Sequence, residues 1–287
     1  MTVDNEDFRI KIHVLHCGRM LVSPRVPYGG GITLKNLLHE VTDRVSDRVE
    51  LPVSAYLIEH PNGRVLVDTG WGREISPEGV YDESAVKSQM PDYLAALYRP
   101  WVANGETVVE QLAAMGLRPE DIDIVVLTHL DADHTSGLRS LMGAKRFLLP
   151  EEERWWADRT VYRLRQPAGL WEGMPIEHFW FKGTMEGPLW WSYDLFGDET
   201  VTLVCLPGHS DGHIGLRIRN GEKFVILTSD AAYTERSWRE DILPGFGFNP
   251  KAIRKSYAWI RSQAQEPGCV AVIANHDPDV EPQVIEL

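Results

Sequence analysis

The sequence has few of the features that mark secreted or membrane-spanning proteins. It contains only three cysteines, Cys17, Cys205 and Cys269, which are odd in number and far apart in the chain. This pattern disfavours a disulfide framework or a zinc knuckle, and it predicts small buried hydrophobic residues in a reducing compartment. No apolar run approaches the ~18 residues of a transmembrane helix, so we expect no membrane span.

Positive charge is also scarce. The chain has 29 lysines and arginines against 42 aspartates and glutamates, a formal net charge of −13, and no basic tract. Because binding to a phosphate backbone needs a basic face, we expect no nucleic-acid partner. The first residues, MTVDNEDFRIKIHVLHCG, carry acidic groups where a signal peptide carries basic ones. A cytoplasmic protein is therefore expected.

Strand-like segments occur in two blocks. The first block has a strand over 9–15, a hairpin over 53–67 and a strand over 122–127, with a helix over 106–116. The second block has strands at 201–206, 214–218, 224–227 and 270–273. A helix begins there at Asn249 and Pro250, a typical N-cap and first helical residue. This order predicts an α/β protein with two packed sheets flanked by helices.

The chain shows neither an internal repeat nor a long linker rich in Gly, Ser or Pro. With 287 residues, 43% of them hydrophobic, it is long enough to bury a sizeable core. We therefore expect a single domain over residues 1–287.

The most informative segment is 128–137, Thr-His-Leu-Asp-Ala-Asp-His-Thr-Ser-Gly. It directly follows a predicted buried strand, and it places four metal-capable side chains within six residues: His129, Asp131, Asp133 and His134. Imidazole and carboxylate together suit divalent transition metals. A solvated turn is the alternative, but it poorly explains two histidines and two alternating aspartates.

Three further strands end in a metal-capable residue. His209 follows the strand at 201–206, Asp230 follows 224–227, and His276 follows 270–273. A lone histidine at a strand end is more often a structural residue. Four such strand ends meeting at one edge of the fold instead predict a dinuclear metal site.

With these motifs the chain resembles the metallo-β-lactamase superfamily of hydrolases, and within it the N-acyl-homoserine-lactone lactonases. The resemblance runs from Val-Asp-Thr-Gly at 67–70 to His276. It implies an αββα sandwich of two mixed sheets, with the metals at one edge. It also implies one metal held by His129, Asp131, His209 and Asp230, and a second held by Asp133, His134, His276 and the bridging Asp230.

Other residues take roles from the same resemblance. Tyr233, three residues after Asp230, occupies the place of the substrate-facing tyrosine of the lactonase branch, although a buried core tyrosine is the alternative. Asp68 is expected to orient a metal ligand, and His213 to do the same or to be structural.

One position departs from the family pattern His-x-His-x-Asp-His, because Asp131 stands where the second histidine is usual. The alternative to ligation by Asp131 is a degraded first site with one metal or none. If Asp131 does ligate, its hard oxygen shifts metal preference from Zn, the first expectation, toward Mn, Fe or Co. Three carboxylates and a hydroxide would then offset the charge of two divalent ions.

The resemblance implies a metal-dependent hydrolase that opens a lactone by attack of a metal-bridging hydroxide. Tyr233 would stabilise the oxyanion, and Asp133 would pass the proton onward. The expected substrate is a small-molecule lactone or ester, with N-acyl-homoserine lactones as candidates and quorum quenching as the corresponding role. The alternatives are thioester or phosphodiester hydrolysis, or a non-catalytic binding protein.

Aromatic residues concentrate between 150 and 200, where six of the ten tryptophans lie. We expect most of them to form the core of an inserted helical segment, with a pocket lining or a homodimer face as alternatives. The loop at 24–31 contains three consecutive glycines. It is either a lid beside the active site or a plain surface loop.

Overall fold

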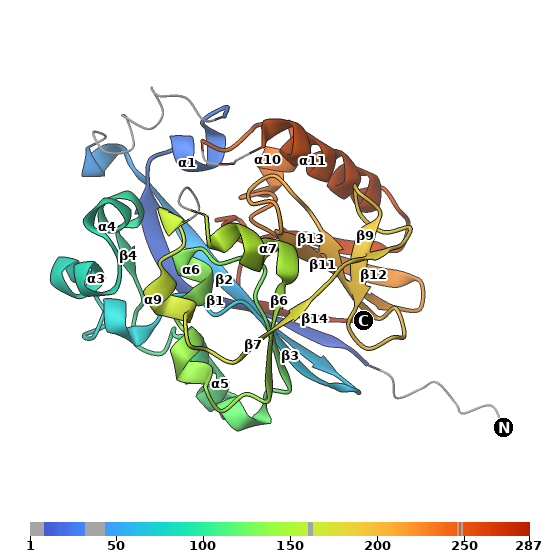
Figure 1. The fold of residues 1–287 in the computed structure, drawn as a ribbon, viewed down its shortest axis with the longest axis horizontal. Coiled ribbons are helices and arrows are strands. Elements are labelled where there is room, and N and C mark those ends of the chain that lie inside the picture. Colours follow the sequence, from blue (N-terminus) through green and yellow to red (C-terminus); the bar gives the residue numbers. More distant parts are fainter. Residues whose placement is uncertain (1–8, 32–43, 160–162, 246, 248) are drawn as a thin grey trace.

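The computed structural model describes residues 9–31, 44–159, 163–245, 247 and 249–287. The elements within these ranges are shown in Figure 1. The strands are β1 (Lys11–Val22), β2 (Val49–His60), β3 (Gly63–Val67), β4 (Pro100–Trp101), β5 (Ile124–Val126), β6 (Arg146–Pro150), β7 (Ile176–Phe179), β8 (Lys182–Gly183), β9 (Trp191–Asp194), β10 (Val201–Cys205), β11 (Ile214–Asn220), β12 (Lys223–Ser229), β13 (Cys269–Ala274) and β14 (Gln283–Glu286). The α-helices are α1 (Arg25–Tyr28), α3 (Glu83–Gln89), α4 (Asp92–Tyr98), α5 (Val108–Ala114), α6 (Ala132–Thr135), α7 (Glu151–Ala157), α9 (Ala168–Trp171), α10 (Glu235–Arg239) and α11 (Pro250–Ala264).

The strands form two mixed sheets. The first has the order β14-β1-β2-β3-β5-β6-β7, with β4 paired to β1, and its pairs from β3 to β7 are parallel. The second has the order β13-β12-β11-β10-β9-β8, and within it β12 and β13 are parallel. Since β11 is antiparallel to both β10 and β12, the strands β10, β12 and β13 all end at the same edge.

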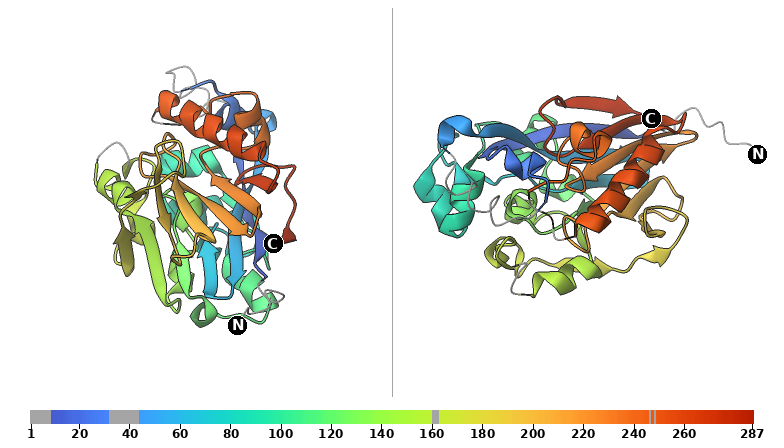
Figure 2. Two further views of the ribbon diagram at one scale, coloured as in Figure 1. Left: turned by 90° about the vertical axis from the view of Figure 1, so that its right-hand side faces the viewer. Right: turned by 90° about the horizontal axis from the view of Figure 1, so that it is seen from above.

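Three hydrophobic layers hold these elements together. The middle layer lies between the sheets, where Ile58 and Val67 of the first sheet share a cluster with Leu203 and Leu216 of the second. An outer layer joins the opposite face of the first sheet to α3, α4 and α5. The other outer layer joins the second sheet to α10 and α11 (Figure 2). The arrangement confirms the expected αββα sandwich.

Local sequence signals explain where several elements begin and turn. The hairpin expected over 53–67 is present as β2 and β3. Asn249 caps α11 by accepting from the backbone N–H of Ala252, and Pro250 is the first helical residue, as predicted. α11 buries Ile253, Tyr257 and Ile260 along one side. In the described part of the chain, no helix combines the length and hydrophobicity that a membrane span requires.

The expectation for the aromatic segment at 150–200 is wrong. This segment forms the short helices α7 and α9 together with β7, β8 and β9, which extend both sheets. Trp171 is buried, whereas Trp180 and Trp190 are 64% and 65% exposed, and Trp155 and Trp191 are also exposed. The physical reason is position: Trp155 lies in the short helix α7, Trp180 follows the edge strand β7, and Trp190 and Trp191 lie at the start of β9, so these side chains reach the surface rather than the core.

The cysteine prediction fits the structure more closely. Cys17, Cys205 and Cys269 are free thiols; the first two are buried and Cys269 is half-buried.

Candidate metal centre

The seven metal-capable residues predicted from the sequence come together at the edge where strands of both sheets end. His129, Asp131, Asp133 and His134 lie in the turn after β5 and in α6, His209 follows β10, Asp230 follows β12, and His276 follows β13. All seven are buried. They form two groups within which the potential ligand atoms lie within 4.8 Å of one another.

The first cluster consists of His129, Asp131 and His209. The Oδ2 atom of Asp131 lies 3.1 Å from Nε2 of His209 and 3.5 Å from Nε2 of His129. Burial, followed by the nearby charge of Arg165, lowers the pKa of His209 to about 4. The lowered pKa favours the neutral imidazole of His209, which is the form that binds a metal.

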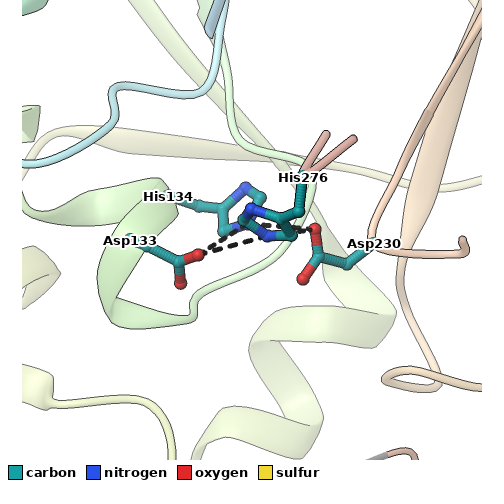
Figure 3. Close-up of side chains that lie close together, drawn as sticks. All are labelled: Asp133, His134, Asp230 and His276. Carbon is teal, nitrogen blue, oxygen red and sulfur yellow. Dashed lines mark ion pairs between the residues drawn. The ribbon is translucent and has the colours of Figure 1, made fainter. Parts of the chain in front are cut away.

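The second cluster consists of Asp133, His134, Asp230 and His276 (Figure 3). The two imidazoles lie between the carboxylates: His276 Nε2 is 3.3 Å from Asp133 and 3.0 Å from Asp230 Oδ1. His134 Nε2 is 3.3 Å from the same Asp230 oxygen. The other oxygen of Asp230, Oδ2, lies 3.6 Å from His209. Asp230 therefore faces both clusters, one oxygen toward each.

Hydrogen bonds behind the histidines fix which ring nitrogen faces the clusters. Asp68 Oδ2 accepts from Nδ1 of His134 over 2.8 Å, and the carbonyl of Pro52 accepts from Nδ1 of His276 over 2.8 Å. Thr128 Oγ1 lies 3.0 Å from Nδ1 of His129. Each contact leaves Nε2 directed at the cluster, the arrangement typical of metal-binding histidines. Asp68 thus orients a histidine, as expected.

His213 has both ring nitrogens engaged outside the clusters. Its Nδ1 donates to the carbonyl of Leu206 over 3.2 Å, and its Nε2 accepts from the backbone N–H of Asp230 over 3.1 Å. The ring therefore holds the Asp230 backbone in place.

The backbone is strained at Asp68 and at Ser229. Asp68 has φ 58° and Ser229, directly before Asp230, has φ 46°. Positive φ in a non-glycine residue is sparsely populated and persists only when surrounding contacts impose it. Here the contacts are hydrogen bonds between the strand ends: Thr128 Oγ1 lies 2.7 Å from Asp68 and 2.8 Å from Ser229 Oγ.

The side chains fit divalent metal ions on chemical grounds. His129 Nε2, His134 Nε2 and Asp230 Oδ1 are buried and have no hydrogen-bond partner within the described ranges. Three carboxylates also converge in the same buried volume, where uncompensated negative charge is costly. Bound cations would satisfy the orphaned atoms and offset the carboxylate charge.

Two tyrosines border the centre. The ring of Tyr233 lies 5.2 Å from the His276 ring and 5.7 Å from the His209 ring, between centroids. Burial and then Asp230 raise the pKa of Tyr233 well above its usual value, so its hydroxyl stays protonated. Sequence reasoning missed Tyr98, whose pKa is raised by burial and then by Asp131 and Asp133. No local pattern at the end of α4 pointed to it.

Sequence reasoning also missed Arg165. Its Nε donates to Asp131 Oδ1 over 2.8 Å, so a buried arginine pairs with the one carboxylate that departs from the family pattern. Burial opposes ionisation of Asp131, but Arg165 and then His129 outweigh it and hold the pKa of Asp131 well below its usual range.

The loop at 24–31 lies beside Tyr233. Gly30 N–H and Gly31 N–H donate to the carbonyls of Leu243 and Pro244. The hydroxyl of Tyr28 lies 3.1 Å from Oγ1 of Thr234, the neighbour of Tyr233. The segment, which contains α1, therefore contacts the residue next to Tyr233, and its role as a lid or as a plain surface loop stays a prediction.

Known proteins share this architecture. A family model described as the metallo-beta-lactamase superfamily matches residues 48–268. An N-acyl homoserine lactonase AttM of Azorhizobium caulinodans is 30% identical over 244 residues, which cover 81% of this chain and 84% of that protein. The AttM lactonase of Rhizobium radiobacter is 29% identical over 260 residues, covering 86% and 90%.

A solved structure of an N-acyl homoserine lactone hydrolase, with the product N-hexanoyl-L-homoserine at its catalytic metal centre, superposes with a TM-score of 0.72. It is 21% identical and covers 96% of this chain and 98% of its own. At that identity the likeness shows a shared fold. Since the family model spans most of the sequence, the chain belongs to the metallo-beta-lactamase superfamily and is a metal-dependent hydrolase.

Proposed function

We propose that the protein is a dinuclear-metal-dependent lactonase that opens small cyclic esters, with N-acyl-homoserine lactones as the first candidates. The observation that carries the proposal is the pair of buried clusters with Asp230 directed at both. Relatives named N-acyl homoserine lactonases match most of this chain and most of their own length, which supports the substrate class.

The proposed ligands are His129, Asp131, His209 and Asp230 for one ion, and Asp133, His134, His276 and Asp230 for the other. Two divalent ions bound there would supply a nucleophilic hydroxide at neutral pH and polarise the ester carbonyl. Zinc is the first expectation, and the oxygen donor of Asp131 makes Mn, Fe or Co alternatives.

The chain's own groups contribute the remaining chemistry. Tyr233 carries a protonated hydroxyl at the border of the centre, and it is suited to donate a hydrogen bond to the oxygen that becomes negative. Burial, partly offset by His134 and His276, raises the pKa of Asp133. Asp133 Oδ2 lies 3.3 Å from His276 Nε2 in the second cluster, and to this carboxylate we assign the transfer of a proton to the departing alkoxide.

The test combines metal analysis with a substrate panel. We expect purified protein to contain about two transition-metal ions per chain and to hydrolyse acyl-homoserine lactones faster than thioesters and phosphodiesters of similar size. Asp230→Asn should lose both metal and activity because the substituted side chain faces both clusters. Protein that binds no metal would support the non-catalytic alternative, and faster thioester or phosphodiester cleavage would replace the lactone assignment.

A further inference from the structure

Arg165 is a buried cation that contacts two of the three first-cluster residues from outside the cluster. Its Nε donates to Asp131 Oδ1 over 2.8 Å, and its Nη2 donates to the backbone carbonyl of His209 over 3.1 Å. The side chains of Arg165 and Asp131 are only 10% and 4% exposed. Little water reaches this ion pair, so it is weakly screened.

The pairing divides the two oxygens of Asp131 between different tasks. Oδ1 is occupied by Arg165, whereas Oδ2 faces His209 and His129 at 3.1 and 3.5 Å. A free carboxylate can offer a metal either one oxygen or both. Because Oδ1 is held by Arg165, Oδ2 is the oxygen of Asp131 that is positioned to bind a metal, just as a histidine offers a single nitrogen.

The pairing also offsets the negative charge that Asp131 adds to the centre. Asp131 adds a negative charge to a buried volume that already holds Asp133 and Asp230. The positive charge of Arg165 offsets it, so the pair contributes no net charge, again like a neutral histidine.

Neighbouring contacts hold Arg165 in this position. Gln166 donates to Glu153 Oε1 over 2.7 Å, and Ser210 donates to Glu153 Oε2 over 2.5 Å. All three of these side chains are buried. Hydrogen bonds to Glu153 of α7 thus link the segment that carries Arg165 to the loop that carries His209.

We propose that Asp131 and Arg165 act as one unit, in which Arg165 is a positioning residue that makes Asp131 a one-oxygen, charge-compensated metal ligand. The inference rests on the metal site of the proposed function. It predicts that replacing either residue alone changes the content or the coordination of the metal site.

The experiment compares wild type with Asp131→His, Arg165→Met and the double variant, each loaded with Co²⁺. Metal content is measured by elemental analysis, coordination by visible absorption, and folding by circular dichroism. Arg217→Met is the matched control, because Arg217 also has a mostly buried side chain paired with a carboxylate, Glu186, and lies on β11 away from the centre.

We expect the metal content of Asp131→His to fall from about two ions per chain to about one. The positive charge of Arg165 is then no longer offset by Asp131, and it repels a cation beside it. The double variant should regain the second ion, because the positive charge of Arg165 is then absent as well. Arg165→Met should keep its metal but absorb more weakly per Co²⁺, because Asp131 can then bind through both oxygens and raise the coordination number. Arg217→Met should match wild type in both readouts.

Two ions in Asp131→His, or an unchanged spectrum in Arg165→Met, would overturn the inference while leaving the metal site intact. Wild type without metal would overturn the proposed function, and the inference with it. If Asp131→His fails to fold while the double variant folds, the result supports the paired unit. If both fail to fold, the spectrum of Arg165→Met decides.

Discussion

Removing the hydroxyl of Tyr233 tests the proposed chemistry most directly. In Tyr233→Phe the ring remains and keeps its packing against His276 and His209. Within the described residues the hydroxyl has no hydrogen-bond partner, so its removal leaves no buried group unsatisfied. We therefore expect unchanged metal content and an unchanged unfolding midpoint.

The effect on turnover follows from the charge that the hydroxyl would meet. A hydrogen bond to a charged group contributes about 1.5–3 kcal/mol. If that bond forms only in the transition state, its loss lowers kcat by about 10- to 150-fold, at roughly 1.4 kcal/mol per tenfold. The loss should fall on kcat rather than KM, because the ground-state ester oxygen carries little charge.

The assay is steady-state hydrolysis of an acyl-homoserine lactone by metal-loaded protein, with metal content measured on the same samples. Tyr257→Phe is the matched control: its hydroxyl donates to the Ile242 carbonyl over 3.3 Å, beneath α11 and away from the centre. It should lose some stability and keep its kcat. An unchanged kcat in Tyr233→Phe would remove this hydroxyl from the mechanism, and a raised KM alone would reassign it to substrate binding.

Three further tests address the fold that supports the centre. Asn249→Ala removes the N-cap of α11 and should lower the free energy of unfolding by about 1 kcal/mol in chemical denaturation. Gly212→Ala places a Cβ atom 2.1 Å from a backbone nitrogen of α7 and should lower the thermal midpoint, whereas Gly169→Ala, whose Cβ meets nothing within 4 Å, should not. Cys17 is buried whereas Cys269 is half-buried, so native protein should be alkylated at Cys269 and not at Cys17; labelling of both, read by mass spectrometry, would contradict the buried environment.

The sequence was sufficient to place the metal-capable residues because each one follows a strand. Strand periodicity located β5, β10, β12 and β13, and residues just past parallel strand ends must meet at one edge of a sheet. The cap of α11 was equally local, since Asn249 and Pro250 adjoin the helix that they begin. Such signals lie within a few residues of the element that they describe.

The aromatic segment failed because burial there depends on the partner rather than on the residue. Trp171 and Trp180 are chemically identical, yet one packs into the outer core and the other lies beyond the end of an edge strand. Composition shows that tryptophans are abundant in this segment. It does not show which of them point toward the core, because the strands there are only two to four residues long. A period of two cannot be read from so short a segment.

Arg165 shows a different limit. Asp131 by itself suggested either a degraded site or a site richer in negative charge, and both interpretations considered only the residues of the motif. The compensating cation lies 34 residues further along the chain, in a segment with no strand or helix periodicity to mark it. General physical chemistry nevertheless indicated where to look: a carboxylate in the place of a buried histidine is stabilised by a positive group nearby, either a bound ion or a cationic side chain. What the sequence could not supply was the choice among 29 lysines and arginines, because that choice is made by the tertiary fold. A substitution that changes the charge of a buried site is therefore better interpreted as one half of a pair, whose other half has to be sought in the structure.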